Sequence, residues 1–431
     1  MAEHRRGANL PSIGGFNRTV VLDAVRRSPD GLSRVELASR TGLSAQTVSN
    51  VTRFLIEAGM IVESGTVVAG RGKPRTILRL EPGSRYAVGV HVDPAVVTYV
   101  LLDLAGTVVA SSTTSTPTAD DPSEVVRTIG SAVDGLIADA GVDVDGVLGV
   151  GIASPGPIDV DAGIVVDPPF LPRWRDVPLR DALAEATGYP VLLEKDVTAA
   201  AVGEMFLAGE SSARNFAFVY FGTGFGVGLV VDHEPVRGVG SNAGDAGHIM
   251  VDQRSLAGTP DGSGTRGEVG AAVAPDRLVR IARERGVALS GGDAVSSDGP
   301  VSSDGPVSSD GSVDAVNRAW DELAKAIAAG DEAAITLAAE AGTVMGDAAV
   351  VIVNLLDIDR VVFGGPFWSR IASAALPAAR AAIVGSPLLV PKHAVDVVES
   401  DRGADVAAVG AACLVLDAAL SPRASGLLIR R

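Results

Sequence analysis

The spacing of apolar residues divides the chain into three zones. Between Asn17 and Leu80, short segments with helical spacing are followed by two strand-like runs. From Arg85 to about Leu289, β-branched apolar runs such as YAVGVHV and FAFVYFGTG alternate with Ala-rich helical segments. Helical spacing returns near Val313 and continues to Ala419, interrupted by the strand-like run VVFGG. This alternation predicts an α/β protein with a small helical head and a larger layered body.

The head pattern predicts short helices joined by tight turns. In Asn17–Arg27 the apolar residues fall on one helical face, and Ser33 with Glu36 forms a capping box that begins a second helix. Gly42 follows the second helix and suits the turn between two crossed helices. The apolar face of the first helix consists of Val20, Val21, Ala24 and Val25.

A third predicted helix, capped by Ser44 and closed by Gly59, has a polar outer face. Hydrogen-bonding side chains near the N-terminal end of such a helix are what base and phosphate contacts require. The residues expected to face inward are Val48, Val51, Leu55 and Ile56. The residues expected to contact double-stranded DNA are Ser44, Gln46, Thr47, Ser49, Asn50 and Arg53.

Two predicted strands follow this helix and flank the basic loop GRGKPR. Its cations Arg71, Lys73 and Arg75 are spaced by Gly and Pro and form a flat tip suited to a minor groove. The capping box, the Gly turn, the polar face and the basic tip together predict a winged helix-turn-helix over residues 17–80. Residues 1–16 are expected to form a flexible arm.

The charge distribution fits this division. The 431-residue chain has a net charge of −16, yet Met1–Leu80 holds twelve Lys and Arg against six Asp and Glu. The remainder holds 24 positive and 46 negative side chains, and a basic head on an acidic body is expected when only the head meets phosphates. Cys413 is the only cysteine, which excludes a disulfide framework and a multi-cysteine zinc cluster. We expect no apolar run to cross a membrane and find no signal-peptide core, which predicts a cytoplasmic protein.

A tandem repeat, VSSDGP-VSSDGP-VSSDGS, occupies Val295–Ser312. Ser, Asp, Gly and Pro favour turns and cannot bury a core, so the repeat is expected to be a disordered surface insertion. Its deletion should barely affect folding or DNA affinity. A partner-binding or phosphorylated loop is the alternative interpretation.

Six segments of the body carry a family resemblance: YAVGVHVDPAVVTYVLLDL, VGIASPGPIDVDAGIV, VLLEKDVTAAAVGE, FGTGFGVGLVVD, GSNAGDAGHIMVD and VVFGGP. They resemble the ROK family (repressors, open reading frames and kinases), particularly its xylose-repressor-like members, from about Phe16 to Leu420. The resemblance implies a two-lobed, actin-like (ribonuclease-H-like) sugar-kinase fold around a cleft. The first lobe would span residues 85–200 and the second 201–402, and a helix over 403–420 would return to the first lobe.

The phosphate-binding segments depart from those of the family's kinases. Such kinases have an aspartate and then Gly-Gly-Thr in the first hairpin, where this chain has His91 and then Asp93, Pro94 and Ala95. Pro94 removes an amide donor and Asp93 adds negative charge, which argues against ATP binding. The Gly-rich loop Gly222–Gly228 is retained, but glycines also close tight hairpins.

The resemblance also implies a structural zinc site made of one histidine and three cysteines. Here Asp261, Ser263 and Glu268 fall at the cysteine positions, while His248 is retained. Zinc prefers sulfur and nitrogen ligands, so we expect neither a metal nor any other cofactor. The loop would instead be held by hydrogen bonds among its own polar groups. A glutamate that follows the cysteines in the family is replaced by Gly270.

The sugar pocket implied by the resemblance is partly retained. Asp196 stands at the family's catalytic aspartate, Asp245 replaces a sugar-binding glutamate, and His248 is kept. Lys195 stands where asparagine is common, and Phe170 replaces a sugar-binding asparagine. Carboxylate and imidazole groups suit hydroxyl recognition, so these five residues are the expected effector contacts. Purely structural roles are the alternatives: a helix cap for Asp196, a bond within its loop for His248 and a core position for Phe170.

Together these features predict a DNA-binding transcriptional regulator, a repressor, whose body binds a sugar or sugar derivative. The body would also pair protomers into a homodimer or homotetramer, and Asp196 would be a vestigial base without catalysis. One alternative is an active ROK sugar kinase in which Asp196 deprotonates a sugar hydroxyl that attacks ATP. Another is a regulator with a vestigial pocket under the control of a protein partner, which Phe170 and Gly270 favour.

Overall fold

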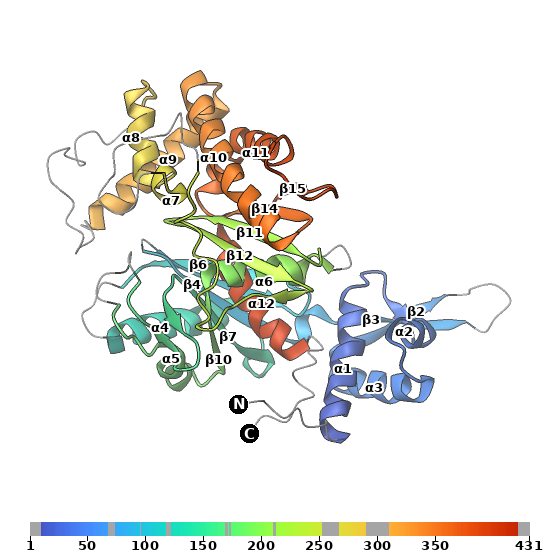
Figure 1. Ribbon diagram of the computed structural model, residues 1–431. Coiled ribbons are helices and arrows are strands. Elements are labelled where there is room, and N and C mark those ends of the chain that lie inside the picture. Colours follow the sequence, from blue (N-terminus) through green and yellow to red (C-terminus); the bar gives the residue numbers. More distant parts are fainter. Residues whose placement is uncertain are drawn as a thin grey trace, which may run out of the picture.

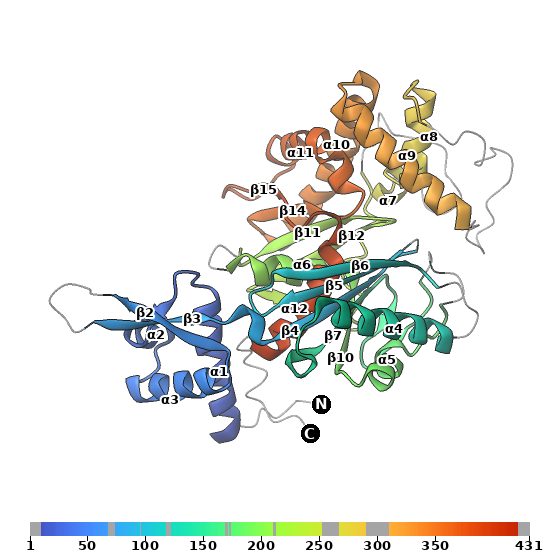
Figure 2. The same cartoon turned by 180° about the vertical axis from the view of Figure 1, so that it is seen from behind.

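The computed structural model describes residues 10–67, 74–94, 96–117, 122–168, 171, 174–209, 213–251, 267–289 and 310–420. A small head lies beside a body of two stacked lobes, and the wing strands of the head extend away from the body (Figures 1 and 2). The predicted fold class is confirmed: a winged helix-turn-helix precedes a body built on two five-stranded sheets.

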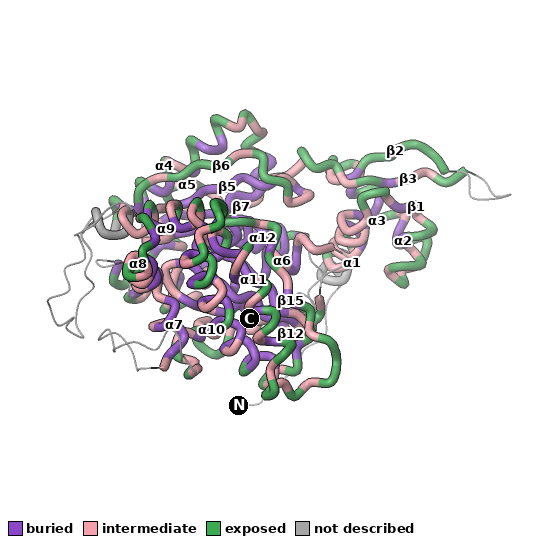
Figure 3. The backbone as a smooth tube through the Cα atoms, turned by 90° about the horizontal axis from the view of Figure 1, so that it is seen from above, coloured by how far each residue is buried: buried purple, intermediate pink, exposed green. Residues whose placement is uncertain are grey.

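The head combines helices α1 (Leu10–Arg26), α2 (Arg34–Thr41) and α3 (Ala45–Glu57) with a three-stranded antiparallel sheet. The strands, in the order β1-β3-β2, are β1 (Leu32–Ser33), β3 (Arg75–Leu80) and β2 (Ile61–Val67). Figure 3 shows β2 largely exposed, whereas β3 is mostly half-buried and its Leu78 is buried.

Local sequence signals account for the turns of the head. The Ser33 amide donates to the Glu36 carboxylate (2.8 Å) and the Glu36 amide donates to the Ser33 hydroxyl (3.3 Å), so the predicted capping box is present. Gly42 ends α2 with φ of 69°, a conformation that glycine adopts without strain. Helix α1 begins at Leu10, inside the segment expected to be a flexible arm. Pro11 is compatible with this earlier start because the first turn of a helix needs no amide donor there.

The first lobe has a five-stranded sheet in the order β10-β7-β4-β5-β6. Helices α4 (Pro122–Ala140) and α5 (Leu179–Thr187) cover one face, and α12 (Val406–Leu420) packs on the other (Figure 2). A Cβ on Gly89 or Gly151 would lie 1.9 Å from a backbone oxygen of α12, so the close packing of α12 requires both glycines. The strands are β4 (Tyr86–Val92), β5 (Val96–Asp103), β6 (Val108–Ser115), β7 (Val147–Ser154) and β10 (Val191–Lys195).

The second lobe has a five-stranded sheet in the order β13-β12-β11-β14-β15, and an aromatic cluster of Phe221, Trp320 and Phe367 packs in its core. Its strands are β11 (Phe216–Phe221), β12 (Phe225–Val231), β13 (Glu234–Pro235), β14 (Arg360–Gly364) and β15 (Asp396–Glu399). Its helices are α7 (Val269–Ala272), α8 (Pro275–Glu284), α9 (Asp310–Ala328), α10 (Glu332–Leu356) and α11 (Trp368–Val384). Short strands β8 (Ile158–Asp159) and β9 (Ile164–Val165) pair beside the first lobe.

Helix α6 (Asp196–Leu207) joins the two lobes. It follows β10 of the first sheet, packs against α12 and lies on β11 and β12 of the second sheet. A Cβ on Gly203 would lie 2.8 Å from the Cα of Gly410 in α12, and a Cβ on Gly228 of β12 would lie 2.1 Å from the Val197 oxygen. Glycine contacts therefore fix α6 closely between its neighbours.

Two sequence expectations need correction. Helix α10 and the segment Gly403–Leu420 are long and apolar enough to cross a membrane by length and composition, contrary to our expectation. In the structure 61% and 72% of their most apolar windows are buried inside the protein, as in core helices. The disordered insertion was expected to span the whole repeat, Val295–Ser312. Helix α9 begins at Asp310, so the last residues of the repeat are helical. The rest of the repeat lies outside the described residues.

Candidate nucleic-acid interface and ligand cleft

Helix α3 presents a polar face above a buried apolar one. Its first turn is capped by Ser44, whose hydroxyl accepts from the Thr47 amide at 3.1 Å. The buried face consists of Val48, Val51, Thr52 and Leu55. Ile56, which was expected to face inward, is only half-buried. Thr52 was not expected on the buried face. Its hydroxyl donates a hydrogen bond to the backbone oxygen of Ser49 at 3.3 Å, so the buried donor has a partner.

Three exposed side chains form a hydrogen-bonded row along α3. The Asn50 side-chain oxygen accepts from the Gln46 amide at 3.1 Å and from the Arg53 guanidinium at 2.9 Å. Because both bonds end on one oxygen, the amide group of Asn50 is oriented and its N–H donors remain directed away from the row. Among the other predicted contacts on this helix, Ser44 is exposed, whereas Thr47 and Ser49 are half-buried.

The wing is an antiparallel ladder in which Val67 pairs with Arg75 at its outer end. Arg75 is exposed there, whereas Arg71 and Lys73 lie outside the described residues. Arg34 of α2 donates to Glu63 of β2 at 2.9 Å, which ties the wing to the helices.

Asp196 begins α6 at the carboxyl end of β10, an edge of a parallel sheet where ligands commonly bind. Its carboxylate accepts from the Val197 amide at 2.7 Å. Burial raises the pKa of Asp196, while His91, the Val197 amide and Lys195 act in the opposite direction. Lys195 is 8% exposed, and its ammonium donates to the Asn242 oxygen at 3.2 Å.

Asn242 brings two predicted segments together at this edge. Its side chain accepts from the Ile158 amide (2.8 Å) and donates to the Ile158 oxygen (2.7 Å), which fastens the GSNAGDAGH segment to the SPGPI segment. Gly244 lies against Val197 at the start of α6. Asp245 belongs to the same segment and is exposed. Asp196, Lys195 and the segment that carries Asp245 are thus neighbours, while Phe170 lies outside the described residues.

The His248 imidazole lies beside a carboxylate. Its Nδ1 lies 3.2 Å from the Glu268 carboxylate, and its side chain is 71% exposed. Asp261 and Ser263 lie outside the described residues, and the described part of the chain has no group of three or more potential ligands for a metal. Of the three positions where the resemblance implies cysteine, Glu268 is the one that the structure describes, and its carboxylate contacts His248. A Cβ on Gly270 would lie 3.0 Å from the Gly247 oxygen, so this glycine serves close packing.

The β4–β5 and β11–β12 turns contact each other. The Thr223 hydroxyl, between β11 and β12, donates to the Asp93 carboxylate, between β4 and β5, at 3.0 Å. The Tyr220 ring lies against Gly222, where a Cβ would be 2.7 Å from a ring carbon, and it meets His91 edge-on at 6.3 Å. Burial raises the pKa of Tyr220 well above its usual value, and Asp196 and Asp93 raise it further.

Two family profiles match the chain. The ROK family profile matches residues 87–418, and a winged helix-turn-helix DNA-binding profile matches residues 21–62. The chain belongs to the ROK family. The ROK match covers the whole body, including α6 and both hairpins.

Named ROK relatives include both regulators and kinases. The xylose repressor of Bacillus subtilis is 28% identical over 246 residues, 57% of this chain and 63% of that protein. A glucokinase of Halalkalibacterium halodurans is 31% identical over 200 residues, 46% of this chain and 60% of that protein. Less than two thirds of each relative is therefore spanned. The crystal structure of a ROK transcriptional regulator, a homologue of the E. coli MLC protein, matches with a TM-score of 0.70 and 22% identity, over 96% of this chain and 98% of that one, which shows the shared fold.

Several residues around Asp196 were not among the predicted site residues. His91 and Asp93 had been noted only as departures from the kinases, yet both influence the pKa of Asp196. Asn242 and Tyr220 gave no signal in the sequence, because an asparagine in a Gly-rich segment suggests a turn and a tyrosine in an apolar strand suggests core. Conversely, the structure shows no hydrogen bond between the side chain of Asp196 and that of Asp245 or His248 among the described contacts.

Proposed function

We propose that this ROK protein is a cytoplasmic DNA-binding transcriptional repressor whose body binds a sugar or sugar-derived effector without phosphorylating it. The observation that carries the proposal is the exposed row of Gln46, Asn50 and Arg53 on a capped third helix beside a wing. The match to the winged helix-turn-helix profile and the relatives named as repressors support it.

On DNA, α3 would enter the major groove. Gln and Asn amides match the donor and acceptor pair of adenine, and Arg suits guanine or a phosphate. Arg53 donates to Asn50, so base readout by Asn50 depends on an intact row. Ser44, Thr47 and Ser49 would contact the backbone near the helix start, and the wing cations Arg71, Lys73 and Arg75 would follow the minor groove. Two protomers in a homodimer or homotetramer would place two such helices about one DNA turn apart.

The effector would bind at the start of α6, in contact with Asp196, Lys195, Asp245, His248 and Phe170. Carboxylates, a cation and an imidazole together supply both acceptors and donors, as sugar hydroxyls require. The effector must bind one arrangement of the body more tightly than another in order to change DNA affinity. Neither a metal nor a nucleotide is part of this proposal.

A ROK sugar kinase is the second candidate. Burial raises the pKa of Asp196, which suits a general base that deprotonates a sugar hydroxyl, and a glucokinase is among the relatives. The bond from Thr223 to Asp93 argues against it, because a carboxylate lies where a kinase would accept phosphate oxygens. A coupled assay of ATP turnover with a sugar panel separates the two. Turnover abolished by Asp196→Asn would establish the kinase.

The repressor proposal is tested with purified full-length protein and DNA from the region upstream of its own gene. We expect salt-sensitive, site-specific binding by fluorescence anisotropy, weakened by one member of a sugar panel that includes D-xylose and D-glucose. Specific binding that no sugar changes would support a DNA-binding regulator but contradict a sugar effector, and it would point to control by a protein partner. The absence of specific binding at moderate salt would refute the repressor.

A further inference from the structure

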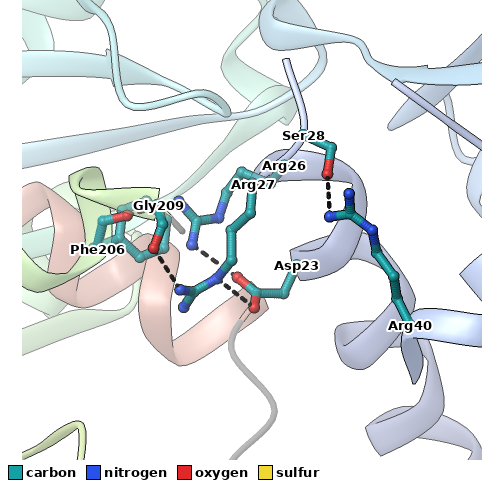
Figure 4. Close-up of polar contacts among 7 residues, drawn as sticks. All are labelled: Asp23, Arg26, Arg27, Ser28, Arg40, Phe206 and Gly209. Atoms are coloured by element: carbon teal, nitrogen blue, oxygen red, sulfur yellow. Dashed lines mark hydrogen bonds and ion pairs between the residues drawn. The ribbon is translucent and has the colours of Figure 1, made fainter. Parts of the chain in front are cut away.

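Arg26 and Arg27 of the head bind backbone carbonyls of the body near the C-terminal end of α6, and we call this pair of contacts the clamp. Arg26, at the end of α1, donates to the Phe206 oxygen at 2.8 Å, and Arg27 donates to the Gly209 oxygen at 2.8 Å. Phe206 lies in the last turn of α6 and Gly209 lies two residues beyond its end, a region where helix carbonyls lack partners within the helix and cations are favoured. Figure 4 shows both guanidinium groups reaching from α1 toward this end.

The clamp is held in one geometry by further contacts. The Asp23 carboxylate binds Arg26 at 2.7 Å with one oxygen and Arg27 at 2.8 Å with the other. Arg26 also stacks on the Phe206 ring, with its guanidinium carbon 3.8 Å from the ring centroid, and its side chain is only 4% exposed. Burial lowers the pKa of Arg26, an effect that Asp23 opposes. Two guanidinium groups fixed by one carboxylate can transmit a displacement of α6 to α1.

The other end of α6 is the proposed effector site. Asp196 begins the helix, and a helix of 12 residues is about 18 Å long. Close glycine contacts to α12 and β12 leave α6 little room to deform, so a displacement at Asp196 moves the clamped carbonyls as well. Within the head, α1 packs against α3, and buried Val21 and Val25 of α1 belong to one connected core with Phe206.

We propose that Arg26 and Arg27 are positioning residues that connect the state of the cleft at Asp196, through α6, to the orientation of α1 and the recognition helix α3. The proposal rests on the proposed function, because it assigns the route by which an effector would act. It predicts coupling between residues at opposite ends of α6 that share no contact.

The test uses hydrogen exchange of the full-length protein, so it needs neither a known effector nor an operator. Asp196→Asn perturbs the cleft, and Arg27→Gln, at a half-buried position that tolerates change better than Arg26, opens the clamp. We expect Asp196→Asn to change the exchange rates of amides in α1 and α3 about fivefold, as for a typical coupling between sites. In the Arg27→Gln background, which keeps only the Arg26 half of the clamp, the same change at Asp196 should alter these rates clearly less.

Arg40→Gln is the matched control. Arg40 is a head arginine that donates to Ser28 within the head, away from α6 (Figure 4). This variant removes the same charge and should preserve the response of the head to Asp196→Asn. The proposal is overturned if Asp196→Asn leaves head exchange unchanged, or if its full effect persists in the Arg27→Gln background. The DNA-binding experiment tests the proposed repressor function separately: failure to bind specific DNA there would refute the repressor, whereas the exchange experiment tests only the coupling through α6.

Discussion

The Thr223 hydroxyl donates to the Asp93 carboxylate at 3.0 Å across the space between the two lobes. The two residues belong to the turns that the family resemblance aligns with the phosphate-binding turns of kinases, and Tyr220 packs against Gly222 beside them. A negative carboxylate at this position repels polyphosphate and occupies the hydroxyl that would donate to it.

We therefore expect millimolar Mg-ATP to leave the melting temperature of the protein unchanged. A ligand present at a hundred times its dissociation constant would add about 2.7 kcal/mol, which a thermal shift detects readily. An ATP-dependent increase of several degrees would contradict this interpretation of the Asp93–Thr223 contact. Mg²⁺ alone is the control, because it reports any stabilisation that is independent of the nucleotide.

The row on α3 predicts that Asn50→Ala reduces affinity for the cognate site by about 1–3 kcal/mol and relaxes the base preference there. The substitution removes the oxygen that both Gln46 and Arg53 contact, so two further side chains lose their orientation. Anisotropy titrations against cognate and single-base variant sites measure both effects. Glu57→Gln, an exposed change at the last residue of the same helix, should leave the base preference intact.

The wing predicts a different signature. Arg75→Ala should weaken binding to all sequences alike and lower the salt slope by about one unit, because a phosphate contact releases counterions but reads no base. Arg75 is exposed at the outer end of the β2–β3 ladder. Affinity measured from low to moderate salt on specific and random DNA checks this. A loss confined to the cognate site would assign Arg75 to base readout.

The sequence predicted those features that short-range chemistry determines. The Ser33–Glu36 capping box and the Gly42 turn each depend on residues a few positions apart, so both can be predicted from the sequence alone. In contrast, the hydrogen bond from Arg26 to Phe206 joins residues 180 positions apart, and the bond from Thr223 to Asp93 joins residues 130 positions apart. No local pattern encodes such pairs, because they depend on how the lobes and head pack. The family resemblance located Asp196, and it placed His91 and Asp93 in the first hairpin, but it did not indicate that the three residues influence one another.

Close packing of α12 on the first sheet predicts that Gly89→Ala is strongly destabilising. The new Cβ would lie 1.9 Å from the Ala408 oxygen, so the helix or the strand must move, at a cost of about 1–3 kcal/mol or more. Gly135→Ala is the matched control, because Gly135 is exposed in α4 with no atom within 4 Å of the added group. That change should stabilise by about 0.5–1 kcal/mol through helix propensity. Denaturant unfolding measures both; similar values for the two variants would refute the packing argument.

The raised pKa of Asp196 predicts a specific dependence of stability on pH. Burial makes the folded carboxyl bind its proton more readily than the unfolded one, so the folded state carries more bound protons between the two pKa values. The free energy of unfolding should therefore fall as the pH rises from about 4, the ordinary value, through the raised pKa of the folded state. Each unit of that shift contributes about 1.4 kcal/mol.

Asp196→Asn removes this contribution. The variant should show a flatter pH profile and a higher melting temperature than the wild type at neutral pH, because an uncharged amide avoids the desolvation of a buried carboxylate. The amide oxygen can still accept from the Val197 N–H, so this hydrogen bond at the start of α6 should be retained, although Asp196 is not the N-cap of the helix. Asp245→Asn, the same change at an exposed carboxyl, is the matched control. If Asp196→Asn lowered stability at neutral pH, the carboxylate would be stabilising the fold, and the direction assigned to its pKa shift would be wrong.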